Sequence, residues 1–209
     1  LAVYKPQGLL SNIEYYENEE DINARYLKIG GLEPTLESIV KSDFKEAIIC
    51  HRLDRNTCGI VLFALNDMSY NQLLKGFKNG AIKKEYIAYV SNSNFYKDSE
   101  ILENYILKDR KTGFSKVFDN KVIKLDKNND YAILNITIPT GKTHQIRAQM
   151  KAINHSIIGD SKYGKNDINK KFRVYRQLLF AYKYSFNFNK NSSLYYLNEI
   201  NVKLDKKYI

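Results

Sequence analysis

The sequence contains few side chains that bind transition metals. Its 209 residues include two cysteines, Cys50 and Cys58, and three histidines, His51, His144 and His155. Zinc sites in proteins are built largely from these two residue types, so a zinc site here would need an unusual ligand set. We therefore expect no metal site.

Long hydrophobic runs are absent as well. The longest uninterrupted apolar stretch covers residues 60–65, whereas a membrane-spanning helix needs roughly 20 apolar residues. The sequence also shows no signal-peptide pattern, internal repeat or low-complexity tract. These absences predict a soluble, cytoplasmic protein without membrane contact, and the length favours a single domain over residues 1–209.

Arginine is scarce, although the chain is strongly basic. The formal net charge is +10, and seven of the 33 basic residues are arginines. A chain this basic is usually attracted to polyanions, so RNA or DNA is the expected partner. Acidic lipids would fit the charge, but the sequence has no basic amphipathic helix with a clean apolar face. Because the planar guanidinium group suits bidentate recognition, we interpret arginines in motifs as site markers.

Hydrophobic patterning predicts an α+β fold with a mixed, mostly antiparallel central sheet, flanked by helices and loops. Strands are predicted at residues 1–4, 59–64, 84–90, 122–125, 131–138 and 178–188. Helices are predicted from an opening at Pro34-Thr35-Leu36 to about Lys41, from an Asn66 or Asp67 cap to Gly80, and over residues 143–154. Residues 11–31 are predicted to form a mobile loop, and residues 128–130 a hairpin turn.

The patterns within two of these elements predict which side chains are buried. Every second residue of the strand at 178–188 is aromatic, from Phe180 to Phe188. Such alternation is typical of a half-buried strand, so we interpret these rings as core rather than as a base-stacking platform. In the helix at 143–154, helical spacing predicts that Ile146, Met150 and Ile153 pack inward and that His144, Arg147 and Lys151 occupy a neighbouring face.

The most informative motif is His51-Arg52-Leu53-Asp54, which continues as Arg55-Asn56-Thr57-Cys58-Gly59. It places the Asp54 carboxylate between two guanidinium groups, directly before a predicted central strand. Nearby cations and hydrogen bonds favour the charged form of a carboxylate, so we predict that Asp54 is held ionised in a pocket. A surface ion pair is the alternative interpretation of this motif alone.

The second motif is Gly141-Lys142-Thr143-His144-Gln145-Ile146-Arg147, where a turn leads into a helix. A helix N-terminus rich in donors attracts phosphate or carboxylate groups. If Arg147 reaches Asp54, a charge-assisted pair would orient the carboxylate and lower its pKa. The alternative is a capped helix with a surface arginine.

Five motifs together resemble the RluA family of RNA pseudouridine synthases. In chain order they are Lys5-Pro6-Gln7-Gly8, the His51 to Gly59 motif, Lys84-Glu85-Tyr86, Thr143-His144-Gln145-Ile146-Arg147 and Gly159-Asp160-Ser161-Lys162-Tyr163-Gly164. The ordered set, spread over about residues 1–185, is far more specific than any one motif. The histidine before Arg52 and the Thr-His-Gln-Ile-Arg run favour this branch over the related RsuA branch.

The resemblance implies the pseudouridine synthase catalytic fold and an isomerase that acts on uridine in RNA without a cofactor or metal. Asp54 matches the essential aspartate of the family. Tyr86 matches the tyrosine that stacks on the flipped uracil, and Arg147 matches the basic partner of the aspartate. Arg52 matches the arginine that fills the gap left in the RNA stack. Further RNA contacts are expected from His51, Arg55, Lys84, Lys142, Thr143, His144 and Gln145.

Several functional alternatives remain open at this point. Large-subunit ribosomal RNA is the preferred substrate, and transfer RNA is the rival. A catalytically idle RNA-binding module of the same fold, or a DNA-binding or ribosome-associated structural protein, would also carry this charge. We expect a monomer. Because the chain starts without methionine inside a predicted strand, we also expect room for an upstream RNA-binding segment of the S4 type.

Overall fold

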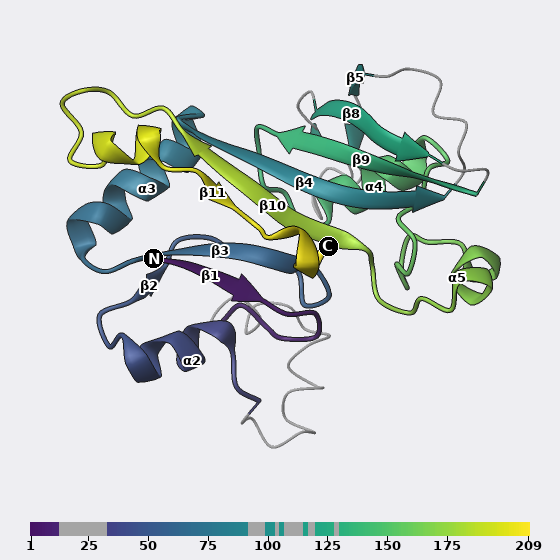
Figure 1. Ribbon diagram of the computed structural model, residues 1–209, viewed down its shortest axis with the longest axis horizontal. Helices are drawn as coiled ribbons and strands as arrows, with labels where there is room; N and C mark the ends of the chain where they lie inside the picture. Colours follow the sequence, from purple (N-terminus) through teal and green to yellow (C-terminus); the bar gives the residue numbers. More distant parts are fainter. Residues whose placement is uncertain (13–32, 92–98, 103–104, 107–114, 117–119, 128–129) are drawn as a thin grey trace.

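The computed structural model describes the chain except for residues 13–32, 92–98, 103–104, 107–114, 117–119 and 128–129 (Figure 1). The main sheet contains β1 (Ala2–Lys5), β2 (Ile48–Ile49), β3 (Cys58–Ala64), β4 (Ile82–Ser91), β5 (Ser99–Leu102), β8 (Asn120–Lys127), β9 (Tyr131–Ile138), β10 (Leu179–Phe186) and β11 (Val202–Lys203). A separate ribbon pairs β6 (Tyr105–Ile106) with β7 (Ser115–Lys116). The helices are α2 (Leu36–Asp43), α3 (Asp67–Asn79), α4 (Gln145–Ala152) and α5 (Asn166–Phe172), with the 3-10 turns η1 (Tyr195–Glu199) and η2 (Lys206–Tyr208).

The main sheet is mixed and mostly antiparallel, which confirms the predicted fold class. Its strands follow the order β1-β3-β10-β4-β9-β8-β5, with β2 beside β3 and β11 beside β10. The pair β3 and β10 is parallel, and the other strand pairs between described residues are antiparallel. Strand β10 therefore lies between β3 and β4, although it follows them by about a hundred residues (Figure 1).

Glycine is required where β3 and β10 approach each other. Gly59 has a φ of +121°, which few L-residues adopt. A Cβ atom at this position would lie 2.3 Å from the carbonyl oxygen of Ala181. The contact that joins the two strands therefore depends on the glycine that closes the His51 to Gly59 motif.

Hydrophobic side chains pack on both faces of the sheet. On one face, Ile146 and Met150 of α4 share a cluster with Ala88 and Val90 of β4. On the other face, Leu73 of α3 belongs to a separate cluster with side chains of β3 and β10. Helix α4 and the loop before it are thereby fixed against the face of β4 that carries Tyr86.

The local predictions hold for most elements. Strand β9 matches residues 131–138, and Asn66 caps α3 through a 2.8 Å bond from the Ser69 N–H to its side-chain oxygen. Gly80 ends α3 with a left-handed φ of 79°. The predicted loop at 11–31 and the turn at 128–130 fall largely outside the described residues. Among the described helices, none is long and apolar enough to span a bilayer.

Two sequence predictions need adjustment. The aromatic side chains of β10 are core as predicted, but Tyr182 is only half-buried because it lies at a register shift between Ala181 and Lys183. The helix predicted at 143–154 is shorter, running over Gln145–Ala152. His144 takes a left-handed φ of 56°, so the helix begins after it and not at Thr143.

Candidate functional site

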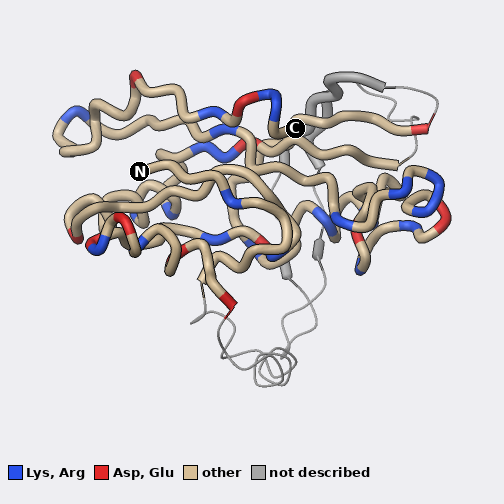
Figure 2. Tube along the Cα trace, turned by 60° about the horizontal axis from the view of Figure 1, so that its bottom comes forward, with Lys and Arg blue, Asp and Glu red and all other residues tan. Residues whose placement is uncertain are grey.

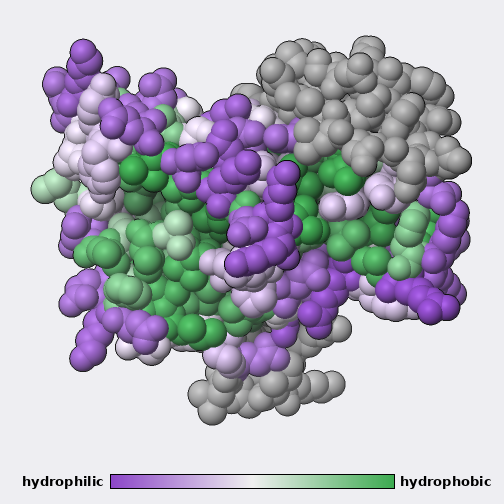
Figure 3. Space-filling model, viewed as in Figure 1, coloured by the Kyte–Doolittle hydropathy of each residue, from purple (hydrophilic) through white to green (hydrophobic). Residues whose placement is uncertain are grey.

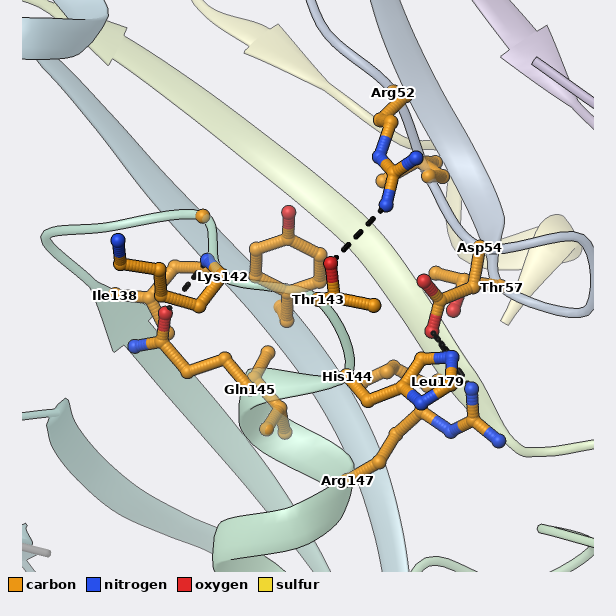
Figure 4. Close-up of a pocket in the computed structure, with 14 residues that line it drawn as sticks. Arg52, Asp54, Thr57, Ile138, Lys142, Thr143, His144, Gln145, Arg147 and Leu179 are labelled. Atoms are coloured by element: carbon orange, nitrogen blue, oxygen red, sulfur yellow. Dashed lines mark hydrogen bonds and ion pairs between the residues drawn. The ribbon is translucent and has the colours of Figure 1, made fainter. Parts of the chain in front are cut away.

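A pocket opens where four chain segments meet (Figure 4). The segments are the loop before β3, the middle of β4, the end of β9 with the turn into α4, and the start of β10. Its volume is about 490 Å³, counting the part open to solvent. The described lining residues are Arg52, Leu53, Asp54, Thr57, Tyr86, Ile138, Gly141, Lys142, Thr143, His144, Gln145, Ile146, Arg147 and Leu179.

Asp54 and Arg147 meet in this pocket. The Arg147 Nη1 atom donates to Oδ2 of Asp54 at 2.8 Å, across 93 residues of sequence. The Asp54 side chain is 20% exposed and the Arg147 side chain 8%. A charge-assisted hydrogen bond of this length orients the carboxylate. The conditional prediction that Arg147 reaches Asp54 is therefore confirmed as a contact.

Arg147 is held from behind by Asp160, a fully buried residue of the Gly159 to Gly164 motif. The Arg147 Nε and Nη2 atoms donate to the two carboxylate oxygens of Asp160 at 2.7 and 3.0 Å. The backbone N–H groups of Lys162 and Tyr163 donate to the same carboxylate at 2.9 Å each. Burial by itself would raise the pKa of Asp160, but these hydrogen bonds outweigh it and hold that pKa below its ordinary value.

Arg147 shares a face of α4 with His144, as helical spacing predicted, because both side chains approach Oδ2 of Asp54. The burial of its guanidinium group between two carboxylates was not predicted. Such burial of a cation is tolerated because its donors are satisfied by Asp54 and Asp160. Of the three side chains predicted to share this face, only Lys151 is exposed.

The backbone around Asp54 is fixed by buried polar groups. The Ser11 hydroxyl accepts from the Leu53 N–H at 3.0 Å and donates to the Leu53 carbonyl at 2.9 Å. The fully buried Lys5 ammonium donates to the Arg55 carbonyl at 2.9 Å. Burial lowers the pKa of Lys5 to about 8, against opposing attraction by Asp54. These contacts hold the Asp54 loop from both sides, so the motif at Lys5 serves the position of the carboxylate.

His144 stands beside the carboxylate. Its Nε2 atom lies 3.8 Å from Oδ2 of Asp54, and its Nδ1 atom lies 3.3 Å from the Tyr163 hydroxyl. Burial lowers the pKa of His144; the Asp54 charge opposes this shift and Arg147 reinforces it. The imidazole is therefore mainly neutral at neutral pH, and its contact with Asp54 is not a full ion pair.

The turn before α4 supplies the opposite wall of the pocket. Arg52 reaches across to it, with Nη2 3.3 Å from the Thr143 hydroxyl oxygen, as Figure 4 shows. Gln145 stabilises the turn, because its side-chain oxygen accepts from the Thr140 hydroxyl and the Lys142 N–H at 2.8 and 3.0 Å. Lys142 itself is exposed at the pocket rim.

Tyr86 lies on the central strand β4 and is buried apart from its face on the pocket. Burial raises its pKa well above the ordinary value, and the nearby Asp54 charge adds to the shift, although a hydrogen bond with Tyr184 opposes it. The phenol is therefore neutral over the physiological pH range. Its ring, rather than a phenolate, is what the pocket offers to a ligand.

Three of the predicted RNA-binding residues lie outside the pocket lining. Arg55 turns away from Asp54, donating to the Gly8 carbonyl at 2.9 Å and to Glu33 at 2.7 Å. The prediction that Asp54 lies between two flanking guanidinium groups is therefore wrong for Arg55; the arginine paired with the carboxylate is Arg147.

His51 and Lys84 are also turned into the protein. His51 accepts from the Leu62 N–H at 3.0 Å and packs against the rings of Phe77 and Tyr184. Burial and the nearby Lys84 charge lower the pKa of His51 to about 3. Lys84 lies 5.7 Å from the centre of the Phe77 ring, and burial lowers its pKa to about 8. Neither residue is among the described residues that line the pocket.

Sequence reasoning missed three contributors to the site. Asp160 fixes Arg147, Tyr163 stacks at 5.3 Å from the Arg147 guanidinium, and Gln177 donates to the Thr57 hydroxyl at 2.6 Å. The Gly159 to Gly164 motif marked the region of the first two, but nothing in its spacing shows that it faces α4. Gln177 carries no local signal.

Comparison with known proteins gives a consistent result. A family model described as RNA pseudouridylate synthase matches residues 1–152. A protein of Helicobacter pylori named "Uncharacterized RNA pseudouridine synthase" is 34% identical over 158 residues, covering 72% of this chain and 63% of that protein. A "Ribosomal large subunit pseudouridine synthase D" of Borreliella burgdorferi is 31% identical over 95% of this chain and 62% of its own length. The chain thus spans less than two thirds of the length of these relatives.

Other similarities support the same fold. A "tRNA pseudouridine synthase C" of Pasteurella multocida is 27% identical over 78% of this chain and 70% of its own length. The solved structure titled "Human RNA Pseudouridylate Synthase Domain Containing 4" superimposes with a TM-score of 0.65 at 18% identity, covering 99% of this chain and 86% of that one. With a family model matching most of the chain and relatives above 30% identity, the chain belongs to the RNA pseudouridylate synthase family.

Proposed function

We propose that the chain isomerises uridine to pseudouridine in RNA. In this reaction the bond between N1 of uracil and C1′ of ribose breaks, the base turns, and a bond forms between C5 and C1′. C5 loses its proton and N1 gains one, so the reaction needs no other substrate. The observation that carries the proposal is the buried chain of contacts from Asp160 through Arg147 to Asp54, which ends at the wall of the pocket.

The composition of the pocket fits one acting carboxylate. Asp54 is the only carboxylate among the described lining residues, whereas Arg52, Lys142 and Arg147 contribute positive charge. A glycosidase-type acid and base pair would need a second carboxyl group that faces the bond. Asp160, the other carboxylate at Arg147, is fully buried and is held by four hydrogen bonds, so it does not fill that role. The described part of the pocket instead favours a single carboxylate that acts on the ribose or base, surrounded by cations that attract phosphate.

The remaining roles follow from position. An enzyme that acts on a base must extrude it from the RNA stack, which costs a few kcal/mol. Tyr86 presents a neutral ring on which the uracil can stack, and its raised pKa disfavours proton removal by a phenolate. Arg52, on the rim beside Thr143, is placed to fill the gap in the stack. Lys142, Thr143 and His144 are the remaining rim residues proposed to contact RNA.

Ribosomal RNA of the large subunit is the proposed substrate class. The Borreliella burgdorferi relative, named for the large subunit, aligns over 95% of this chain at 31% identity. The relative named for tRNA aligns over 78% at 27% identity. The greater coverage favours ribosomal RNA of the large subunit. We expect a cytoplasmic monomer to act on it.

Tritium release tests the reaction directly. RNA labelled with 5-³H-uridine loses tritium only if the bond at C5 forms, so total RNA is incubated with wild type and with Asp54→Asn. We expect release by wild type and loss of at least 10³-fold in the variant, because an amide cannot replace a carboxylate in covalent or acid–base chemistry. Filter binding of the same RNA should be nearly unchanged in Asp54→Asn.

Fractionated RNA then separates the alternatives. Release from ribosomal but not transfer RNA supports the proposed substrate, and the reverse result assigns tRNA. Full activity of Asp54→Asn would overturn the mechanism. If folded wild type binds RNA but releases no tritium from any fraction, the chain is an idle RNA-binding module of the same fold.

A further inference from the structure

The loop between α5 and β10 carries an unusually exposed aromatic side chain. Tyr175 is 71% exposed, the highest value among large hydrophobic side chains in the described residues. A single exposed apolar residue is ordinary on a protein surface and needs no function. Tyr175 differs from the others in its electrostatic surroundings and in what its loop contacts.

The segment around Tyr175 is densely cationic. Residues 161–177 contain six lysines and arginines and one carboxylate, Asp167. Figure 2 shows these positive positions gathered along α5 and the loop that follows it, and Figure 3 shows hydrophilic side chains edging this end of the molecule. Lys171 is paired with Asp130 at 2.6 Å. Arg173 and Arg176, which flank Tyr175, are exposed, and their side chains form no ion pair or hydrogen bond with described residues.

The loop is anchored to the residue that holds Arg147. The buried Asn169 side chain accepts from the Gly159 N–H at 2.7 Å and donates to the Asp160 carbonyl at 3.2 Å. The Val174 N–H in turn donates to the Asn169 carbonyl at 3.0 Å. A ring presented by a backbone fixed in this way loses little conformational entropy when a ligand binds.

The loop also borders the pocket. Gln177 donates to the hydroxyl of Thr57, a lining residue, at 2.6 Å, and its carbonyl accepts from the Gln7 side chain at 2.8 Å. Tyr175 is two residues before Gln177, so their Cα atoms are at most about 7 Å apart. The exposed Tyr175 is therefore carried by backbone that runs beside the pocket wall at Thr57.

We propose that Tyr175, flanked by Arg173 and Arg176, is a stacking platform for an unpaired base next to the target uridine. Aromatic rings accept any base by stacking, and adjacent guanidinium groups neutralise the neighbouring phosphates. The platform binds RNA outside the pocket and takes no part in bond breaking. This proposal rests on the proposed function in one respect: the RNA that stacks on Tyr175 is the substrate of the reaction.

The absence of tryptophan from the sequence gives a direct test. Tyr175→Trp creates a protein with one tryptophan, whose fluorescence is quenched when a base stacks on it. The probe is a stem-loop RNA with unpaired uridines in its loop, titrated at constant ionic strength. Tyr196→Trp is the matched control, because Tyr196 is 62% exposed on η1, at the opposite end of the molecule (Figure 1).

We expect saturable quenching in Tyr175→Trp and little change in Tyr196→Trp. Fully paired duplex RNA and polyglutamate should quench Tyr175→Trp far less than the stem-loop. Unchanged fluorescence in Tyr175→Trp, under conditions where filter binding shows the complex, would overturn the platform. So would equal quenching by polyglutamate, which would indicate an acidic protein partner.

Kinetics give a second, independent test. Tyr175→Ala should raise KM for tritium release about tenfold at nearly unchanged kcat, and Tyr175→Phe should restore KM. Arg173→Gln should reduce the slope of log affinity against log salt by about one. Wild-type KM in Tyr175→Ala would refute the platform. Quenching without tritium release by wild type would refute the proposed function and leave the platform standing.

Discussion

Replacement of Asp160 by asparagine should damage the site without touching the substrate. Asp160 is fully buried, and its carboxylate accepts four hydrogen bonds, two from Arg147 and two from backbone N–H groups. Asp160→Asn keeps the size of the side chain but removes the negative charge. It also turns one acceptor into a donor that faces a guanidinium group.

The cost can be worked from these contacts. Removing one partner of a buried ion pair typically costs about 3–5 kcal/mol. The amide oxygen retains part of the hydrogen bonding, so we expect a loss of about 2–4 kcal/mol in the free energy of unfolding. For a chain of this length the melting temperature should fall by about 5–12 °C. Because Arg147 would no longer be held in place for Asp54, kcat should fall about 100-fold.

Urea unfolding followed by circular dichroism and tritium release from labelled RNA measure the two effects. Asp167→Asn is the matched control, because Asp167 is an exposed carboxylate in the first turn of α5. It should cost less than about 1 kcal/mol. A stability within about 0.5 kcal/mol of wild type, together with an unchanged kcat, would refute the role assigned to Asp160.

The contribution of Asp160 to the free energy of unfolding should also depend on pH. The pKa of Asp160 is lowered in the folded state, so its stabilising contribution is complete above the unfolded pKa near 4. That contribution is lost as the pH falls through the lower folded pKa. The stability difference between wild type and Asp160→Asn should therefore be constant above about pH 5 and shrink in more acidic solution.

Two further predictions concern buried basic side chains that lie outside the pocket lining. Lys84→Met should stabilise the protein by about 1–3 kcal/mol at pH 7, because burial lowers the pKa of Lys84 to about 8 and makes its charged form costly. Urea unfolding measures this gain, which should vanish by about pH 10.5, where lysine is neutral in the unfolded chain as well. RNA affinity that fell with this substitution would instead show that Lys84 contacts the ligand. Burial and the Lys84 charge lower the pKa of His51 to about 3. Between pH 7 and pH 5 this histidine binds a proton in the unfolded chain but not in the folded one, so the free energy of unfolding of wild type should fall by about 2 kcal/mol. His51→Gln should abolish that part of the pH dependence, and an identical stability profile in the variant would contradict the buried neutral imidazole.

The predictions that succeeded from sequence depend on local signals. Every second residue of β9 is apolar, from Ala132 to Ile138, and Pro139 follows the strand; α3 has Asn66 at its start and Gly80 at its end. Such signals act within a few residues, so they are visible without the fold. The aromatic alternation of β10 is of the same kind.

The predictions that failed concern contacts between distant segments. Arg55 is next to Asp54 in sequence, but its side chain leaves for Gly8 and Glu33 because the turn that ends at Thr57 directs it outward. Asp160 lies beside Arg147 only because the Gly159 motif packs against α4. No rule of sequence spacing relates these positions, because the order of strands in the sheet determines which loops lie next to each other.

The position of β10 also decides when the protein can assemble. Without β10 the sheet would consist of two parts, one with β1, β2 and β3 and the other with β4, β9, β8 and β5. Asp54 belongs to the first part and Tyr86 to the second, and residues 179–186 join them. During synthesis both parts emerge with an unpaired strand edge, which can pair wrongly until β10 is available. Formation of the pocket is therefore a late event in folding, and its rate should depend on the docking of a strand encoded near the end of this sequence.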